Sequence, residues 1–238
     1  MGDGLFSSGL SAGEAQALWL SLKTGLVGTA FSLPIGIAIA WVLARSNFRG
    51  KIFLDGLVHL PLVLPPVVTG YVLLLLFGHN GAIGHWLEAH TGFSFAFNWK
   101  GAALASAIMG FPLMVRAIRL SFEAVDPRLE AAARTLGASA TNSFLSVTLP
   151  LITPGIIAGS LLGFARAIGE FGATITFVAN IPGETQTLPI ALYSALQSPD
   201  GEINAMRFVL LSLALAAVAL IASEVLARGA QTRIRGRI

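Results

Sequence analysis

Long apolar runs alternate with short polar stretches along this chain, and the runs approach or exceed the length of a bilayer crossing. Such a crossing needs about 20 predominantly apolar residues in a helix. Five segments fit, and we predict a membrane-spanning helix over each: about residues 25–44, 57–77, 101–120, 155–178 and 208–226. The pattern therefore predicts an all-α integral membrane protein whose residues 1–238 form a single transmembrane domain.

The second predicted span contains three prolines near its start, Pro61, Pro65 and Pro66. Proline lacks a backbone N–H group, so it removes a helical hydrogen bond and bends or breaks the helix. The bend is either an ordinary kink in a packed helix or a break that lines a transport pathway, an arrangement that transporters use.

The fourth predicted span carries small residues and an isolated pair of charges. Gly155, Gly159 and Gly163 recur at every fourth position, which lets another helix backbone approach closely. Further along, Arg166 and Glu170 lie four residues apart in an apolar run, where a charge is costly unless it is paired or faces a wet cavity. We interpret this pair either as a structural ion pair or as part of a substrate pathway or its gate.

The polar segment from residue 122 to residue 154 has helix signals of its own. Asp126 followed by Pro127 predicts a helix start, because the carboxylate can accept an orphan N–H and proline fits the first helical position. Gly137 predicts the end of that helix, and a second short helix is predicted over about 142–147. Beyond it, two prolines are expected to interrupt the backbone, Pro150 and Pro154.

The first of these short helices is predicted to have two different faces. Leu129, Ala133 and Leu136 recur at helical spacing and form an apolar stripe. Glu130 and Arg134 have the i,i+4 spacing of an ion pair on another face. The segment is therefore either a solvated loop or a surface that meets a partner.

This segment resembles the cytoplasmic coupling loop of ABC importer permeases, whose pattern is Glu-Ala-Ala, a glycine a few residues on, then an apolar residue, one spacer and Leu-Pro. The corresponding residues here are Glu130, Ala131, Ala132, Gly137, Val147, Leu149 and Pro150. Glu130 lies one residue further from Gly137 than the broad pattern has it, so Ala131 occupies the strict glutamate position. The resemblance implies that these residues, with Arg134, couple the chain to an ATPase, and it implies the type I importer permease fold.

Composition and charge support the membrane assignment and orient it. The chain is 55% hydrophobic and 11% charged, which excludes an ordinary soluble domain, and it has no cysteine for thiol chemistry or disulfides. Eleven of the fifteen Lys and Arg residues fall in the first loop, the coupling region and the tail: Arg45, Arg49, Lys51, Arg116, Arg119, Arg128, Arg134, Arg228, Arg233, Arg235 and Arg237. By the positive-inside rule these parts are cytoplasmic and the N-terminus is outside. This distribution explains the net charge of +3 without a nucleic-acid partner.

Neither a metal site nor an ATPase site is predicted in the chain. His79, His85 and His90 are spaced six and five residues apart, so they do not share a helical face, and we expect a solvated loop there. The phosphate-binding pattern G-x-x-x-x-G-K-[ST] is absent, so we predict that the chain is not an enzyme. ATP and Mg²⁺ would then bind to a partner subunit.

Three stretches of the chain resemble the permease of molybdate ABC transporters, whose relatives carry tungstate or sulfate and thiosulfate. The resemblance covers about residues 20–226 and is carried by PLVLPPVVTGYVLLLLFG, ARTLGAS and FARAIGEFGATITFVANIPGETQTLPIALY. It implies a homodimer in the bacterial inner membrane, joined to ABC ATPase subunits and served by a periplasmic or lipid-anchored oxyanion-binding protein.

Passage of a tetrahedral oxyanion requires hydrogen-bond donors more than a lasting cationic trap. The ends of broken helices and the hydroxyls of Thr69, Thr174 and Thr176 could supply such donors. Two other classes compete with this hypothesis. An ion-driven transporter could use Glu170 as a proton carrier, but no second repeat is recognisable, and a membrane enzyme would need a catalytic constellation that we do not find.

Overall fold

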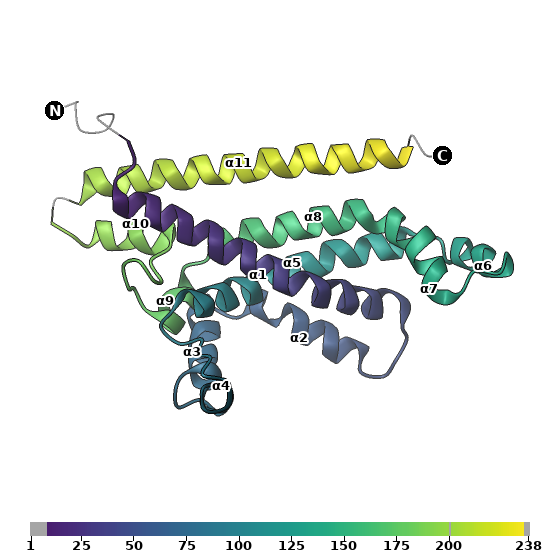
Figure 1. Ribbon diagram of the computed structural model, residues 1–238, viewed down its shortest axis with the longest axis horizontal. Helices are drawn as coiled ribbons and strands as arrows, with labels where there is room; N and C mark the ends of the chain where they lie inside the picture. The colour runs from purple at the N-terminus through teal and green to yellow at the C-terminus, as the bar shows by residue number, and fades with distance from the viewer. Residues whose placement is uncertain (1–8, 200, 236–238) are drawn as a thin grey trace.

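The computed structural model describes residues 9–199 and 201–235, and every regular element in them is a helix (Figure 1). Four helices are long and apolar enough to cross a membrane: Ala12–Arg45, Trp99–Ala124, Ala140–Ile168 and Glu202–Ala222. A fifth crossing results if the helices Lys51–Val63 and Pro66–Phe77 are counted as one broken span. The predicted all-α membrane architecture is confirmed.

The first span, α1 (Ala12–Arg45), begins well before the predicted residue 25. Ser11 caps it in a reciprocal box with Glu14, which satisfies backbone donors at the helix start. Glu14 is buried and is paired with Arg207 of α11 (Glu202–Arg235), with 2.8 Å between Oε1 and Nε. The first turn of α1 is therefore part of the helical bundle, because the charge of Glu14 has a partner there.

The predicted second span is two helices. α2 (Lys51–Val63) and α3 (Pro66–Phe77) meet at an angle of 114°. Pro65 is the N-cap of α3 and Pro66 its first residue, where the missing N–H groups interrupt no hydrogen bond of α3. The break that the prolines predict is thus present, and it lies between α2 and α3.

Close contact between α5 (Trp99–Ala124) and α8 (Leu149–Ile168) forms the centre of the bundle. A Cβ added at Gly110 would lie 2.5 Å from the carbonyl oxygen of Gly163, and one at Gly159 would lie 2.9 Å from that of Met114. The glycine spacing therefore predicted the helix contact correctly. The fully buried side chains packed around it include Leu43, Ile118, Phe122 and Ile152.

The predicted fourth span, 155–178, has different bounds. α7 (Ala140–Ser143) continues through a π-helical turn, η1 (Phe144–Thr148), into α8, so neither Pro150 nor Pro154 interrupts the backbone. Pro150 does not break the helix because it lies in the first turn of α8. The residue before it, Leu149, donates its N–H five residues back to the carbonyl of Phe144. The helix ends at Ile168, and α9 (Gly172–Val178) is a separate element.

The remaining helices occupy stretches that were predicted to be loops. α4 (Ala82–Thr91) follows α3, and α10 (Leu188–Leu196) precedes α11. The end of α1, the α6–α7 region and the end of α11 lie at one end of the molecule, while α10 and the start of α1 lie at the other (Figure 1). This arrangement places the three cation-rich regions of the sequence at the same end.

Candidate functional site

The short helix α6 (Pro127–Thr135) projects from the end of the bundle and is fixed at both of its ends. At its start, Asp126 Oδ1 accepts a hydrogen bond of 2.9 Å from the backbone N–H of Arg128, and Pro127 occupies the first helical position. The predicted start is confirmed, since the carboxylate satisfies a donor that the helix itself leaves unpaired.

The end of α6 is set by Gly137, whose φ of +94° is left-handed. Its N–H bonds to the carbonyl of Arg134 at 3.0 Å, and the next N–H, of Ala138, bonds to that of Ala133 at 3.1 Å. These two bonds form a Schellman motif, which glycine permits at little steric cost. The predicted stop is therefore confirmed, and a short helix of fixed length results.

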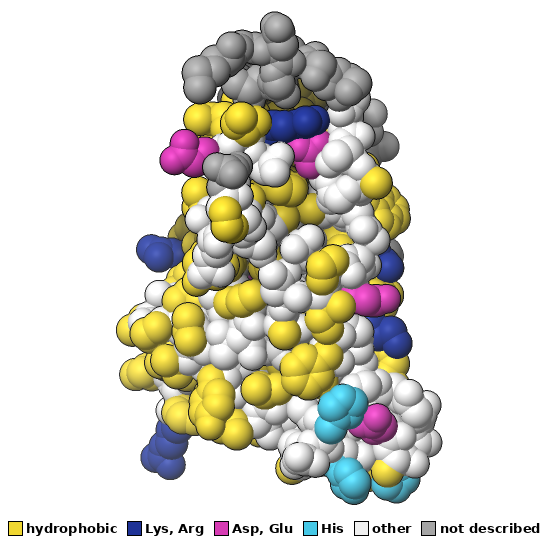
Figure 2. All heavy atoms as spheres, turned by 90° about the vertical axis from the view of Figure 1, so that its left-hand side faces the viewer, with side chains coloured by type: hydrophobic (Ala, Val, Ile, Leu, Met, Phe, Trp, Pro, Cys, Tyr) yellow, Lys and Arg dark blue, Asp and Glu magenta, His cyan; other side chains and the backbone are white. Residues whose placement is uncertain are grey.

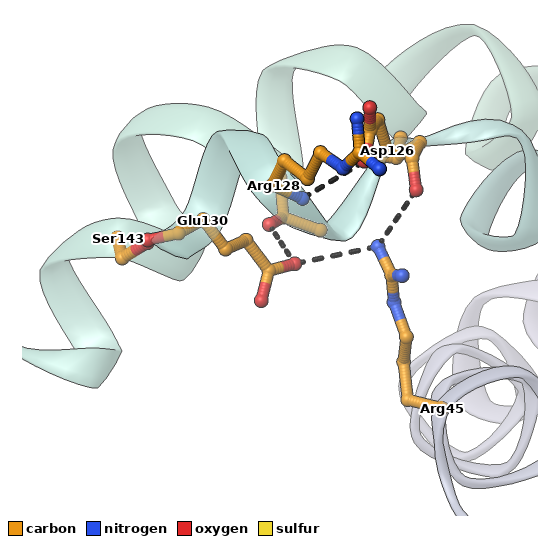
Figure 3. A network of polar contacts seen from close by, with 7 residues as sticks. Arg45, Asp126, Arg128, Glu130 and Ser143 are labelled. Carbon is orange, nitrogen blue, oxygen red and sulfur yellow. Dashed lines mark hydrogen bonds and ion pairs between the residues drawn. The ribbon is translucent and has the colours of Figure 1, made fainter. Parts of the chain in front are cut away.

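Glu130 ties α6 to the membrane-spanning helices (Figure 3). Its Oε1 accepts from Arg45 Nη2 at the end of α1, at 3.4 Å, and from Thr148 Oγ1 in η1, at 2.5 Å. The hydroxyl of Ser143 donates to the backbone carbonyl of Glu130 at 3.3 Å, and Arg45 also donates to the carbonyl of Val125. One carboxylate thus joins α6 to α1 and to the base of α8.

The predicted ion pair between Glu130 and Arg134 is wrong. The side chain of Arg45 is 19% exposed and that of Glu130 is 34% exposed, so their attraction is less screened than that of a pair in water. An exposed i,i+4 pair contributes only about 0.3–0.5 kcal/mol. Glu130 therefore pairs with Arg45, 85 residues away, and not with the cation four residues on. Arg134 is exposed.

Three members of this site were not predicted from the sequence: Arg45, Ser143 and Thr148. Arg45 was counted only among the cations that set orientation, although its place at the end of an apolar run next to a loop was a usable signal. The two hydroxyls carried no spacing rule that could relate them to Glu130. They lie in α7 and η1, which fold back beside α6.

The outer side of α6 is not covered by any other described part of the chain. No residue of the helix is buried, and the expected apolar stripe is open, with Leu129 47% and Leu136 89% exposed. The other predicted coupling residues in α6 and at its end are likewise exposed: Ala131, Ala132, Arg134 and Gly137. Pro150 is exposed too, whereas Leu149 packs against the core. This surface is available for a partner.

Arg166 and Glu170 form an ion pair, as the structural interpretation of these two charges predicts. Arg166 Nη1 lies 2.6 Å from Glu170 Oε2. Glu170 is 2% exposed, and its other carboxylate oxygen accepts from the backbone N–H of Ala173 at 2.8 Å. The pair therefore fixes the turn between α8 and α9. A role of either residue in a pathway stays a prediction.

The three candidate threonines differ in their surroundings. Thr69 of α3 and Thr174 of α9 are buried, and their hydroxyls have no hydrogen-bond partner among the described residues. Thr176 donates to the carbonyl of Gly172 at 2.8 Å. The two helices touch, since a Cβ added at Gly70 would collide with the backbone of α9. Thr69 and Thr174 thus supply unused hydroxyls near the broken span.

Histidines gather at one corner of the molecule beside an acidic side chain (Figure 2). His79 Nδ1 lies 2.7 Å from Glu88 Oε2, and His90 stacks on Trp86 at 4.9 Å between ring centroids. Among the described residues, no three His, Cys, Asp or Glu side chains form a group that could hold a metal. The first contact joins α4 to the segment before it, and the second lies within α4.

Comparison with known proteins agrees with this geometry. Residues 32–238 match the family described as binding-protein-dependent transport system inner membrane component. The chain is 57% identical over 220 residues to the molybdenum transport system permease protein ModB of Escherichia coli strain K12, covering 92% of this chain and 96% of that one. It is 53% identical over 221 residues to ModB of Haemophilus influenzae, covering 93% and 96%.

The fold is also similar to a solved structure of a bacterial alginate ABC transporter in complex with an alginate pentasaccharide-bound periplasmic protein. The TM-score is 0.71 at 18% identity, over 94% of this chain and 80% of the other. At that identity the likeness concerns the fold alone.

Proposed function

The chain belongs to the family of binding-protein-dependent transport system inner membrane components, and from that premise we propose that it is the permease subunit of an ABC importer that carries molybdate into the cell. The assignment of molybdate as the cargo rests on the 57% identity to a molybdenum permease over 92% of the chain. Tungstate has the same tetrahedral oxyanion chemistry and is the alternative cargo, with sulfate or thiosulfate next.

We propose that α6 is the coupling helix through which a separate ATPase subunit drives transport. The helix exposes Leu129 and Leu136 to a partner, and Glu130 anchors it from the other side to α1 and η1. A displacement of α6 by the ATPase would therefore move the attached spans as a rigid body. ATP and Mg²⁺ bind to that partner in this proposal, and the permease itself binds no cofactor.

The orientation follows from the same assignment. The end that carries α6 faces the cytoplasm together with the end of α11, and the start of α1 faces outward, where a periplasmic or lipid-anchored binding protein delivers the oxyanion. A second copy of the chain completes the pore. Many large apolar side chains are exposed on the helices of a single chain, and the second copy covers some of them. Lipid covers the remainder.

Thr69 and Thr174 are our candidates for contacts with the passing oxyanion. Both hydroxyls lie at the contact of α3 and α9, next to the break between α2 and α3. Neutral donors suit transport, because they bind an anion without holding it as tightly as a fixed cation would. Thr176 already has a partner and is the weaker candidate. Arg166 and Glu170 would act by holding α9 in place.

The test is ATP hydrolysis and molybdate uptake by the chain reconstituted with its ATPase and a molybdate-loaded binding protein. Gly137→Arg should abolish both ATPase association and stimulation, because it strains the α6 stop and places a bulky cation on the docking side. Gly92→Arg is the matched control: both glycines have positive φ, +94° and +67°, and open space at the Cβ position, but Gly92 ends α4.

The control variant should retain association and uptake. If Gly137→Arg also retains them, α6 is not the coupling helix. If the wild-type complex is stimulated by a tungstate-loaded or sulfate-loaded binding protein and not by a molybdate-loaded one, the cargo assignment is wrong while the coupling assignment stands.

A further inference from the structure

An apolar groove of about 380 Å³ lies between α1 and α5 at the end of the molecule opposite α6. It lies there because α5 ends just before α6, so the first turns of α5, which line the groove, are at the far end. The lining is contributed by α1, by α5 and by the segment that precedes α5, and its members include Val27, Phe31, Phe93, Phe95, Ala103 and Leu104. Phe31 is 77% exposed, so the groove opens to the surroundings of the bundle.

Two lysines lie at this groove with aromatic rings as their neighbours. Lys100 is part of the lining, and its Nζ is 4.3 Å from the ring centroid of Phe93. The Nζ of Lys23 is 3.6 Å from the ring centroid of Trp99, which also lines the groove. Both distances are within the range of cation–π attraction. Among the described side chains, neither ammonium is in an ion pair.

We propose that this groove binds one anionic phospholipid, with an acyl chain along the apolar walls and the phosphate between Lys23 and Lys100. Its volume falls in the range of about 300–1,000 Å³ that ligand sites occupy. Lysines beside a membrane attract anionic lipid, and a Trp next to them is typical of the interface. Free phosphate has no acyl chain to cover the apolar walls. A phospholipid fits both the apolar walls and the two lysines.

Trp99 provides a direct reporter of the occupant. The chain has four tryptophans, Trp19, Trp41, Trp86 and Trp99, so replacing the first three with Phe leaves a single indole at the groove. The permease complex that carries this change would be titrated with phospholipid whose acyl chain is brominated, since bromine quenches indole fluorescence on contact. We expect brominated phosphatidylglycerol to reach half-maximal quenching at a mole fraction at least threefold lower than brominated phosphatidylcholine.

Charge variants test the headgroup contact. Lys23→Gln with Lys100→Gln should bring the two titrations together, whereas Arg at both positions should keep them apart. Lys51→Gln, at the start of α2, is the matched control and should keep the preference. These variants use the same single-tryptophan protein, so the readout does not depend on transport.

Several results would overturn the proposal. Equal quenching by the two lipids in the otherwise unchanged protein is the first, and it needs no lysine variant to fold. A preference that survives the double Gln change is the second. Competition by inorganic phosphate would mean that the headgroup binds alone. Absence of quenching by either lipid would mean that another protein surface, such as a second copy of the chain, fills the groove.

Discussion

Removing the carboxylate of Glu130 should lower the stability of the protein and disconnect α6 from the membrane-spanning helices. Glu130 accepts from Arg45 at 3.4 Å and from Thr148 at 2.5 Å. Exposed ion pairs contribute about 0.2–1 kcal/mol, and hydrogen bonds to a charged group about 1.5–3 kcal/mol. With side chains 34% and 19% exposed, the Glu130 and Arg45 pair falls between these limits, and we expect a coupling energy of about 1–2 kcal/mol.

A double-mutant cycle over Arg45→Ala, Glu130→Ala and the double variant measures that coupling. Unfolding of the purified complex in detergent gives the stabilities, and a difference of about 1–2 kcal/mol corresponds to about 2–8 °C in Tm for a chain of this size. After reconstitution of the same variants into vesicles, molybdate uptake per ATP hydrolysed should fall for Glu130→Ala while ATP hydrolysis continues.

Glu123→Ala is the matched control for stability alone. Glu123 is 40% exposed and pairs with Arg119 at 2.7 Å on α5, so its loss should lower stability slightly and leave uptake per ATP unchanged. Additive effects of Arg45→Ala and Glu130→Ala, together with normal uptake per ATP, would show that the carboxylate does not link α6 to α1.

Four more changes test the packing of the bundle by thermal unfolding. Gly110→Ala should destabilise by about 1–3 kcal/mol, because its Cβ would lie 2.5 Å from the Gly163 carbonyl oxygen, whereas Gly56→Ala, with open space, should stabilise by about 0.5–1 kcal/mol. Ala179→Gly should stabilise by about 1 kcal/mol, because φ of +62° with ψ of −165° is a conformation that suits only glycine. Glu170→Gln should destabilise by roughly 3 kcal/mol, since it leaves the cation facing this buried carboxylate unpaired.

Each of these has a contradicting result. Equal effects of Ala at Gly110 and at Gly56 would show that α5 and α8 are further apart than described. A lower Tm for Ala179→Gly would mean that the backbone there is not strained. An unchanged Tm for Glu170→Gln would show that the ion pair does not hold α9.

The bounds of α6 could be predicted because they depend on chemistry within a few residues. An Asp-Pro start and a glycine stop act through local hydrogen bonds, and the structure has both. The glycine repeat of α8 and the proline break after α2 were equally readable, since each depends on the size or the missing donor of a particular residue. Local rules thus recovered the places where helices begin, end and touch.

The parts that failed have different causes. Glu130 has a cation four residues on, but its partner is Arg45, and that pairing cannot be chosen before the helices are placed side by side. Pro150 is a helix breaker by its local chemistry, but a π-helical turn before it lets the helix continue. The early start of α1 was readable from the sequence, since Ser11 and Glu14 have the spacing of a capping box, and that signal was overlooked.

The exposed, doubly capped α6 also has a consequence for the speed of complex assembly. A helix of nine residues is too short to persist alone in water, yet this one is held at its start, its end and its inner side. A partner therefore meets it already ordered, so binding sacrifices little conformational entropy. Without a slow folding step at the contact, association of the two subunits is limited by diffusion and orientation.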